Sequence, residues 1–371
     1  MGKAPAAAVI QLPIESRARQ MRARGGLAFK LFGVALAGVF ATGVISGRFE
    51  DVYRPFSIAF ALFSLVAFAG FVQGIRALAA PGPGGSALGI GVLTALFPVL
   101  GGAFLTLIGV VLSLTTTADF SRGRQLRRRG RILLPPVAPS NSGEAASPIV
   151  HRDGDAIAAQ WRENGRTEHA SVAAFARLTL DLMALNAPRA LLEAAQQDAL
   201  DEIAHTGLCF SLATAFDGRA LGPGEFPEAV HVPVRLPGRR LRLAQLAVDS
   251  LIDGALHEGL SAAVIARLAQ RCTEPRVKEV LLQIAADEGR HAAHGWDVVE
   301  WCLREGGATV LEVLRGAALV LPEKMDTRRS PTAESGAWES AGIHGAALEA
   351  AEYEKMRHNV LKRLGVVTRR G

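Results

Sequence analysis

The sequence has few of the residues that mark several common classes of site. Its three cysteines, Cys209, Cys272 and Cys302, are far apart, so they show neither the spacing of a zinc site nor a disulfide framework. No glycine-rich phosphate loop follows a strand pattern, and no Ser-His-Asp arrangement can be argued from spacing. Tyr53 and Tyr353 are the only tyrosines in the chain. Residues 155–305 therefore hold none, which disfavours a tyrosine-radical mechanism there.

Charge is missing from three long runs in the first half of the chain. Residues 31–47, 56–75 and 86–118 contain no Asp, Glu, Lys or Arg. A membrane span needs about 20 consecutive apolar residues. We therefore expect a transmembrane domain over residues 31–118, with two or three spans.

The third apolar run leaves two topologies open. It is interrupted by Pro98 and by Gly101 and Gly102, which suit either one kinked helix or a re-entrant pair of half-helices. Basic segments flank the membrane region on both sides, and positive charge favours the cytoplasmic face. Two spans plus a re-entrant block would keep both flanks inside. Three full spans would place one flank outside.

Basic charge is concentrated in the first half. Residues 1–150 carry 15 Lys and Arg against 5 Asp and Glu, whereas the remaining residues carry 26 against 30. The basic balance therefore accompanies the membrane region, and no nucleic-acid partner is expected. Residues 1–30 form a basic cytoplasmic leader in this interpretation. Residues 119–154 form a basic, Pro/Ser-rich linker whose arginines act as a topology signal or bind the head groups of membrane lipid.

The second half is predicted to be helical throughout. A segment rich in proline, residues 217–240, separates two pairs of helices and is expected to be a long crossover. Residues 155–305 are predicted to be a four-helix metal-binding domain, and residues 306–371 a helical extension. The expected helices lie near residues 155–185, 188–215, 241–271, 275–305, 307–321 and 335–363.

Two short stretches in this half match each other. Asp201–His205 reads DEIAH and Asp287–His291 reads DEGRH. Each holds a Glu-x-x-His pair, which a helix presents on one face. Glu168 and Glu258 lie in two further apolar helical segments. In chain order these residues form the Glu, Glu-x-x-His, Glu, Glu-x-x-His ligand set of carboxylate-bridged di-iron and di-manganese sites. Four carboxylates neutralise two divalent ions, and imidazole suits both metals.

These motifs resemble the ferritin-like superfamily over about residues 155–305. DEGRH is similar to the signature of di-iron proteins that activate oxygen, whereas DEIAH has Ala204 where that signature often has arginine. The resemblance implies an all-α fold, a ferritin-like four-helix bundle preceded by transmembrane helices. It also implies that Asp201 and Asp287 each accept the free ring N–H of a ligand histidine; the alternative is a plain helix-surface role. The metal ligands that it implies are Glu168, Glu202, His205, Glu258, Glu288 and His291.

Three more histidines lie close to these motifs. His169 and His257 adjoin candidate ligands, but adjacent helical residues point about 100° apart. We expect them around the site or on the helix surface. His294 lies one turn after His291; it could serve a proton path or have no role, and we favour no role.

The predicted function is a membrane-anchored di-iron oxidoreductase. Two Fe ions, with Mn also possible, would use O₂ or peroxide to hydroxylate or desaturate an unknown small-molecule or lipid substrate, with an unknown electron donor. A homo-oligomer is possible. One alternative is a ferroxidase that handles iron, although the apolar runs hold no acidic or histidine residue for a metal path. The other is a non-enzymatic metal-binding bundle.

The expected location is the cell (inner) membrane, with several spans and the metal domain facing the cytoplasm. A ferrous site and unpaired cysteines suit a reducing compartment. The basic segment at residues 122–131 favours the same side.

Overall fold

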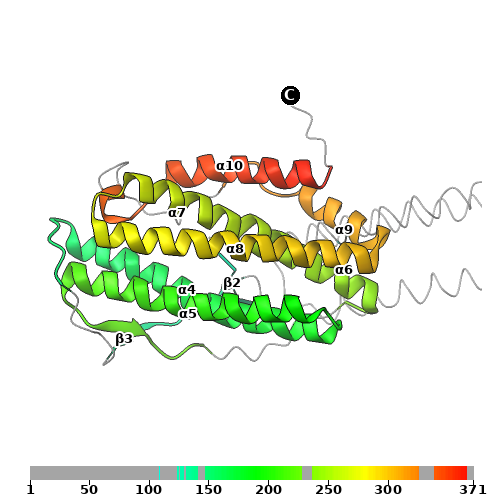
Figure 1. The fold of residues 1–371 in the computed structure, drawn as a ribbon, viewed down its shortest axis with the longest axis horizontal. Helices are drawn as coiled ribbons and strands as arrows, with labels where there is room; N and C mark the ends of the chain where they lie inside the picture. The colour runs from blue at the N-terminus through cyan, green and yellow to red at the C-terminus, as the bar shows by residue number, and fades with distance from the viewer. Residues whose placement is uncertain are drawn as a thin grey trace, which may run out of the picture. The chain divides into compact units, whose positions relative to one another are not determined.

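The computed structural model describes residues 108, 123–124, 126–128, 131–140, 147–227, 236–325 and 338–365. The helical character predicted for the second half is confirmed for these residues (Figure 1). The expected leader lies outside them, and so does the expected transmembrane domain except for residue 108. Within the described ranges, no helix is both long enough and apolar enough to cross a membrane.

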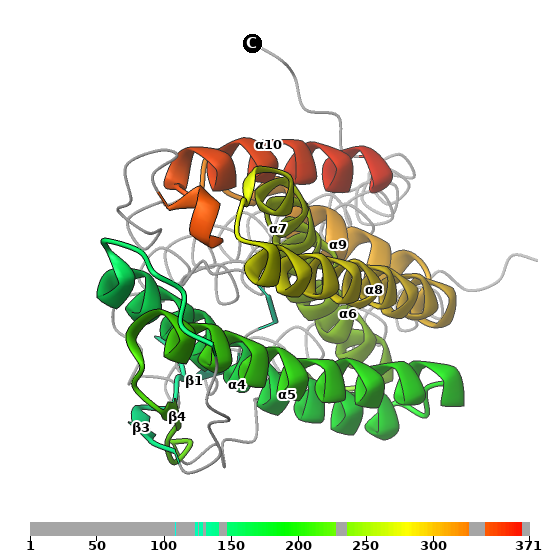
Figure 2. The ribbon, with the colours of Figure 1, turned by 60° about the vertical axis from the view of Figure 1, so that its left-hand side comes forward.

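Long helices dominate the described part of the chain. Helix α4 lies along α5, and η1 and α7 lie along α8, while α5 also contacts α8 (Figures 1 and 2). The helices α6, η1 and α7 follow one another without a break and correspond to the single helix predicted over residues 241–271. The bounds are α4 Gly154–Ala184, α5 Arg189–Asp217, α6 Arg239–Asp249, η1 Ser250–Glu258, α7 Gly259–Arg271 and α8 Pro275–Gly306.

A tight turn makes α4 and α5 neighbours. Leu185 closes α4 by donating its N–H to the carbonyl oxygen of Leu182, and Asn186 then adopts a left-handed φ of 57°. Asparagine tolerates that conformation better than most side chains. Pro188 is extended and leads directly into α5. The chain therefore reverses within a few residues.

The segment η1 is a π-helix in the middle of the third long helix. All nine of its residues are buried. Short π-helical segments within α-helices occur frequently at functional sites. Glu258, one of the candidate ligands, is the last residue of this segment.

Short strand pairs occur where no strand pattern was expected. β1 (Arg127–Arg128) pairs with β2 (Arg131–Ile132), and β3 (Val137–Pro139) pairs with β4 (Leu221–Pro223), both antiparallel. Ladders of two or three residues are too short to show an alternating pattern. The β3–β4 pair joins the predicted linker to the predicted crossover.

The C-terminal part adds further helices to this arrangement. α9 (Ala308–Leu319) packs against α6, and α10 (Ala346–Arg363) packs against α7. A short 3₁₀ turn, η3 (Glu339–Ala341), contacts α7 before α10 begins.

A polar layer separates two apolar clusters in the core. On α4, Ile157 and Trp161 belong to one cluster and Phe175 and Leu178 to the other. Glu168 lies between them. α5 and α8 show the same division, with their Glu-x-x-His pairs between the two clusters. The candidate ligands of α4, α5 and α8 therefore lie between the two apolar clusters.

Candidate metal centre

The structure brings all six residues of the predicted ligand set together. Glu168 comes from the middle of α4, Glu258 ends η1, and α5 and α8 each supply one glutamate and one histidine. The i, i+3 spacing places each Glu and His on the same face of its helix. Glu202, His205 and Glu258 have no exposed surface, and Glu288 and His291 are 1% exposed.

The six side chains form two overlapping groups. Glu168, Glu202, His205 and Glu288 make one, and Glu202, Glu258, Glu288 and His291 make the other. In each group, one ligand atom per residue lies within 4.8 Å of all the others. Each group can therefore hold a metal ion through three carboxylates and one imidazole. Glu202 and Glu288 belong to both groups.

Buried polar atoms without hydrogen-bond partners are a further feature of this cluster. Six atoms of the candidate ligands make no hydrogen bond with any described residue, although all six are buried. Leaving such atoms unpaired is costly, and a metal ion would satisfy them together. The atoms are Glu202 Oε1 and Oε2, His205 Nδ1, Glu258 Oε2, Glu288 Oε2 and His291 Nδ1.

The ring nitrogens of the two histidines face the carboxylates. His205 Nδ1 lies 3.8 Å from Glu202 Oε2 and 4.0 Å from Glu168 Oε2. His291 Nδ1 lies 3.3 Å from Glu202 Oε1 and 3.9 Å from Glu288 Oε2. These pairs lack the alignment of hydrogen bonds. Their separations suit groups that surround a common ion.

Electrostatics also favour a bound cation. Burial raises the pKa of the Glu168 and Glu288 carboxyls well above the usual value, and neighbouring carboxylates add to this effect. Burial raises the pKa of Glu202 as well. Burial lowers the pKa of His291, but Glu202 and the other acids outweigh it and raise that pKa to about 10. Four carboxylates this close together are stable as anions only with compensating positive charge.

The two aspartates of the DExxH motifs contact the histidines across the helix interface. Asp287 Oδ2 on α8 lies 3.0 Å from Nε2 of His205 on α5. Asp201 Oδ2 on α5 lies 3.3 Å from Nε2 of His291 on α8. Each aspartate thus faces the histidine of the other motif and is placed to accept its ring N–H. With Nε2 as the donor to an aspartate, Nδ1 is the ring nitrogen that could bind a metal ion.

Arg290 ties the two aspartates together. Its guanidinium lies 3.0 Å from Asp201 Oδ2 and 2.6 Å from Asp287 Oδ1. Burial raises the pKa of Asp287, but the hydrogen bonds from His205 and Arg290 outweigh it, and the net pKa is lowered. Arg290 therefore contacts the aspartates of both motifs on the exposed side of the site. The DEIAH motif has Ala204 at the equivalent position and contributes no second arginine.

Sequence reasoning missed a buried pair beside His291. His294 Nδ1 lies 2.6 Å from Asp198 Oδ2, and the second oxygen of Asp198 lies 3.8 Å from His291 Nε2. His294 is therefore linked through Asp198 to the surroundings of the site. Asp198 stands four residues before Glu202, so helical spacing could have identified it.

His169 and His257 were expected either around the site or on the helix surface. His257 is fully buried in η1, with Nδ1 3.3 Å from Asp253 Oδ1. His169 is partly buried, and its ring centroid lies 6.0 Å from that of Phe226. Neither belongs to the groups that can hold a metal.

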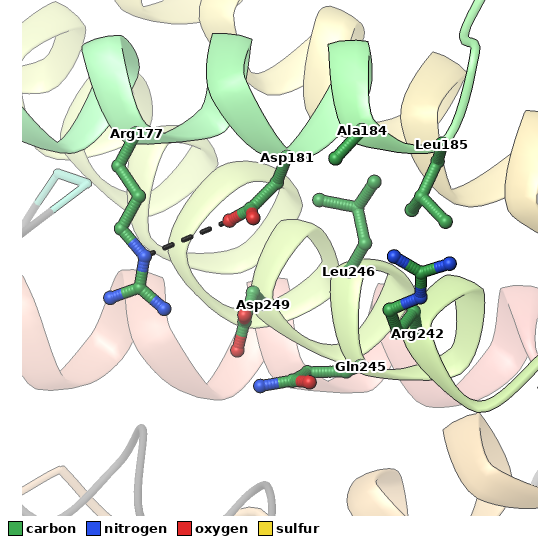
Figure 3. A pocket seen from close by; sticks show the side chains of 8 residues that line it. All are labelled: Arg177, Asp181, Ala184, Leu185, Arg242, Gln245, Leu246 and Asp249. Atoms are coloured by element: carbon green, nitrogen blue, oxygen red, sulfur yellow. Dashed lines mark ion pairs between the residues drawn. The ribbon is translucent and has the colours of Figure 1, made fainter. Parts of the chain in front are cut away.

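A separate pocket lies between α4 and α6, outside the candidate centre (Figure 3). None of the six candidate ligands lines it. Arg177 and Asp181 form an ion pair there at 3.7 Å. Burial raises the pKa of Asp249, partly offset by Arg177, to about 7. The lining residues are Arg177, Asp181, Ala184, Leu185, Arg242, Gln245, Leu246 and Asp249.

Comparisons of the chain with family models, with curated proteins and with solved structures gave no match. The clustered carboxylates and imidazoles are compatible with a di-iron site.

Proposed function

We propose that residues 154–306 form a ferritin-like four-helix bundle that holds a carboxylate-bridged pair of iron ions. The observation that carries this proposal is the sharing of Glu202 and Glu288 by two four-residue groups. A shared carboxylate can give one oxygen to each of two ions. Manganese accepts the same ligand types.

The other ligands divide between the two positions. Glu168 and His205 serve one ion, and Glu258 and His291 serve the other. The proposed activity is that of a membrane-anchored oxidoreductase that hydroxylates or desaturates a small-molecule or lipid substrate. When bound, a pair of ferrous ions would supply electrons for the reduction of O₂ or peroxide.

The protein's own residues hold and shield the centre. Asp287 and Asp201 orient the two imidazoles through Nε2, and Arg290 keeps both aspartates in place. The two apolar clusters on either side exclude water. The Glu168 side chain is 15% exposed, more than any other of the six. Small reactants would therefore approach from the α4 side.

Electrons would come from a separate donor. The four ligand-bearing helices contain no tyrosine. The described tyrosine, Tyr353 on α10, donates its hydroxyl to the carbonyl oxygen of Pro322. Partners in this proposal are an electron donor, membrane lipid and a second copy of the chain.

Metal analysis of the purified full-length chain tests the proposal. We expect two metal ions per chain. Glu202→Ala and Glu288→Ala should each remove both ions, because both positions use these residues. Glu168→Ala and Glu258→Ala should each remove one. Glu279→Ala, an exposed position on α8, is the control and should remove none.

The outcomes also separate the alternatives. Full metal retention in Glu202→Ala and Glu288→Ala, with helical content unchanged by circular dichroism, would contradict the ligand assignment. Formation of Fe³⁺ in air without oxidation of any added substrate would favour a ferroxidase. A wild-type chain that binds metal but consumes no O₂ or peroxide would favour a non-enzymatic bundle.

A further inference from the structure

A segment far from the four helices in sequence reaches the candidate centre. The backbone N–H of Arg124 donates a hydrogen bond to Glu258 Oε1 at 2.8 Å, in a buried position. The two residues are 134 positions apart. Arg124 lies near the start of the linker, just after the long apolar run, and it is only 5% exposed. The part of the linker next to the apolar run therefore contacts a candidate ligand directly.

Local structure fixes the direction of this N–H. Gly123 is buried and has a φ of 78°, a conformation that residues with a Cβ rarely adopt. Beyond Arg124, Leu126 is buried and its carbonyl oxygen accepts the N–H of Leu133 at 2.9 Å. The β1–β2 pair lies within this closed loop. The segment therefore enters the core through a glycine turn and is held by a small hairpin.

The Arg124 side chain packs around the same site. Its guanidinium carbon lies 5.3 Å from the centroid of the Phe175 ring, a cation–π distance. The Phe175 ring in turn lies edge-on to the His291 ring, with centroids 5.3 Å apart. On the other side, a Cβ at Gly254 of η1 would lie 2.7 Å from a guanidinium nitrogen of Arg124. The π-helix therefore leaves room for this side chain by having glycine there.

The hydrogen bond makes the two oxygens of Glu258 unequal. Oε1 accepts the Arg124 N–H, whereas Oε2 is buried and has no hydrogen-bond partner among the described residues. Both lone pairs of Oε2 are therefore open to a metal, whereas one of the two lone pairs of Oε1 is taken by Arg124. Rotation of the carboxylate to offer both oxygens would break the bond to Arg124.

We propose that Gly123 and Arg124 are positioning residues that hold Glu258 as a one-oxygen ligand of the ion on the His291 side. This inference rests on the proposed di-iron centre. It makes the two metal positions unequal: the Glu258–His291 position is held by the membrane-proximal segment, whereas the Glu168–His205 position is the more exposed. Changes in that segment would then alter one metal position and spare the other.

Variants of the full-length chain separate the N–H from the side chain. Arg124→Pro removes the backbone N–H that donates to Glu258, and Gly123→Ala strains the turn that directs this N–H. Arg124→Ala keeps the N–H and removes the guanidinium. Co²⁺ alone is titrated into metal-free protein, and its visible absorption reports the coordination of each ion. Loss of a group that orients a metal ligand typically weakens binding 10–100-fold.

We expect Arg124→Pro and Gly123→Ala to weaken one of the two Co²⁺ binding steps by roughly 10–100-fold and to change the absorption of that ion only. Arg124→Ala should have a smaller effect. Circular dichroism checks folding, and Gly123→Ala decides the question if the proline variant does not fold. Two unchanged binding steps in folded Arg124→Pro or Gly123→Ala would overturn this inference alone. Fewer than two steps in the wild type would instead overturn the proposed function.

Discussion

Asp249 lies at the end of α6, in the pocket beside α4 (Figure 3). Burial raises the pKa of its carboxyl to about 7, despite the offset from Arg177. The folded state therefore binds the carboxyl proton of Asp249 more tightly than the unfolded state, in which the pKa is near its ordinary value of 3.8. Stability should consequently fall as the pH rises from about 4 to 7.

We predict that Asp249→Asn stabilises the protein at pH 8 and has little effect at pH 4.5. The carboxylate is charged in both states at pH 8, so its burial cost is fully present there, on the order of 2 kcal/mol. Thermal melting of the full-length chain at both pH values measures the effect. Asp297→Asn, at an exposed position on α8, is the control and should show no such difference. A gain of equal size at both pH values would contradict the raised pKa.

The candidate ligands were predictable at the level of single residues because helical spacing encodes them. Glu-x-x-His fixes which side chains share a face, and apolar neighbours indicate that the face is buried. The sequence did not reveal which glutamates are shared between the two groups. It also gave no signal for Arg124, because a hydrogen bond over 134 positions depends on the path of the backbone.

Helix boundaries were largely predictable, whereas the π-helix was not. Pro188 and Pro275 precede or begin helices, and Gly218 ends one with a φ of 73°. These are ordinary start and stop signals. The segment η1 has the composition of the α-helices around it, so its wider turn leaves no trace in the residue pattern. All of its residues are buried.

η1 and α8 approach each other closely where both have glycine. A Cβ at Gly295 would lie 2.7 Å from the backbone nitrogen of Ala255 and 2.9 Å from the Cα of Gly254. Backbone atoms cannot move aside as a flexible side chain can. These two glycines therefore set the distance between the helices that supply Glu258 and His291.

We predict that Gly295→Ala destabilises the chain by about 1–3 kcal/mol, the usual cost of overpacking a core. Gly289→Ala on the same helix is the matched control, because a Cβ there meets nothing within 4 Å. It should stabilise the helix by up to about 1 kcal/mol. Chemical denaturation of the two variants measures both effects. Equal stability of the two variants would show that the helices do not cross this closely.

At the scale of the whole molecule, we propose that the metal domain faces the cytoplasm. Arg122, Arg124 and the arginines at residues 127–131 follow the long apolar run, and positive charge favours the cytoplasmic side. All three cysteines lie in the described part of the chain and form no disulfide there. Reduced thiols suit a reducing compartment. The contact between Arg124 and Glu258 would then couple the membrane-proximal segment to the metal centre on that side.

Sidedness can be tested with one introduced thiol. Ser147 is exposed and begins the described chain that leads into α4, whereas Cys209, Cys272 and Cys302 are at most 4% exposed. We predict that Ser147→Cys resists a membrane-impermeant thiol reagent in intact cells and reacts after lysis. The wild-type chain is the control and should react little under native conditions in either case, because its thiols are buried. Labelling of Ser147→Cys in intact cells would place the metal domain outside and contradict the argument from charge and cysteine chemistry together.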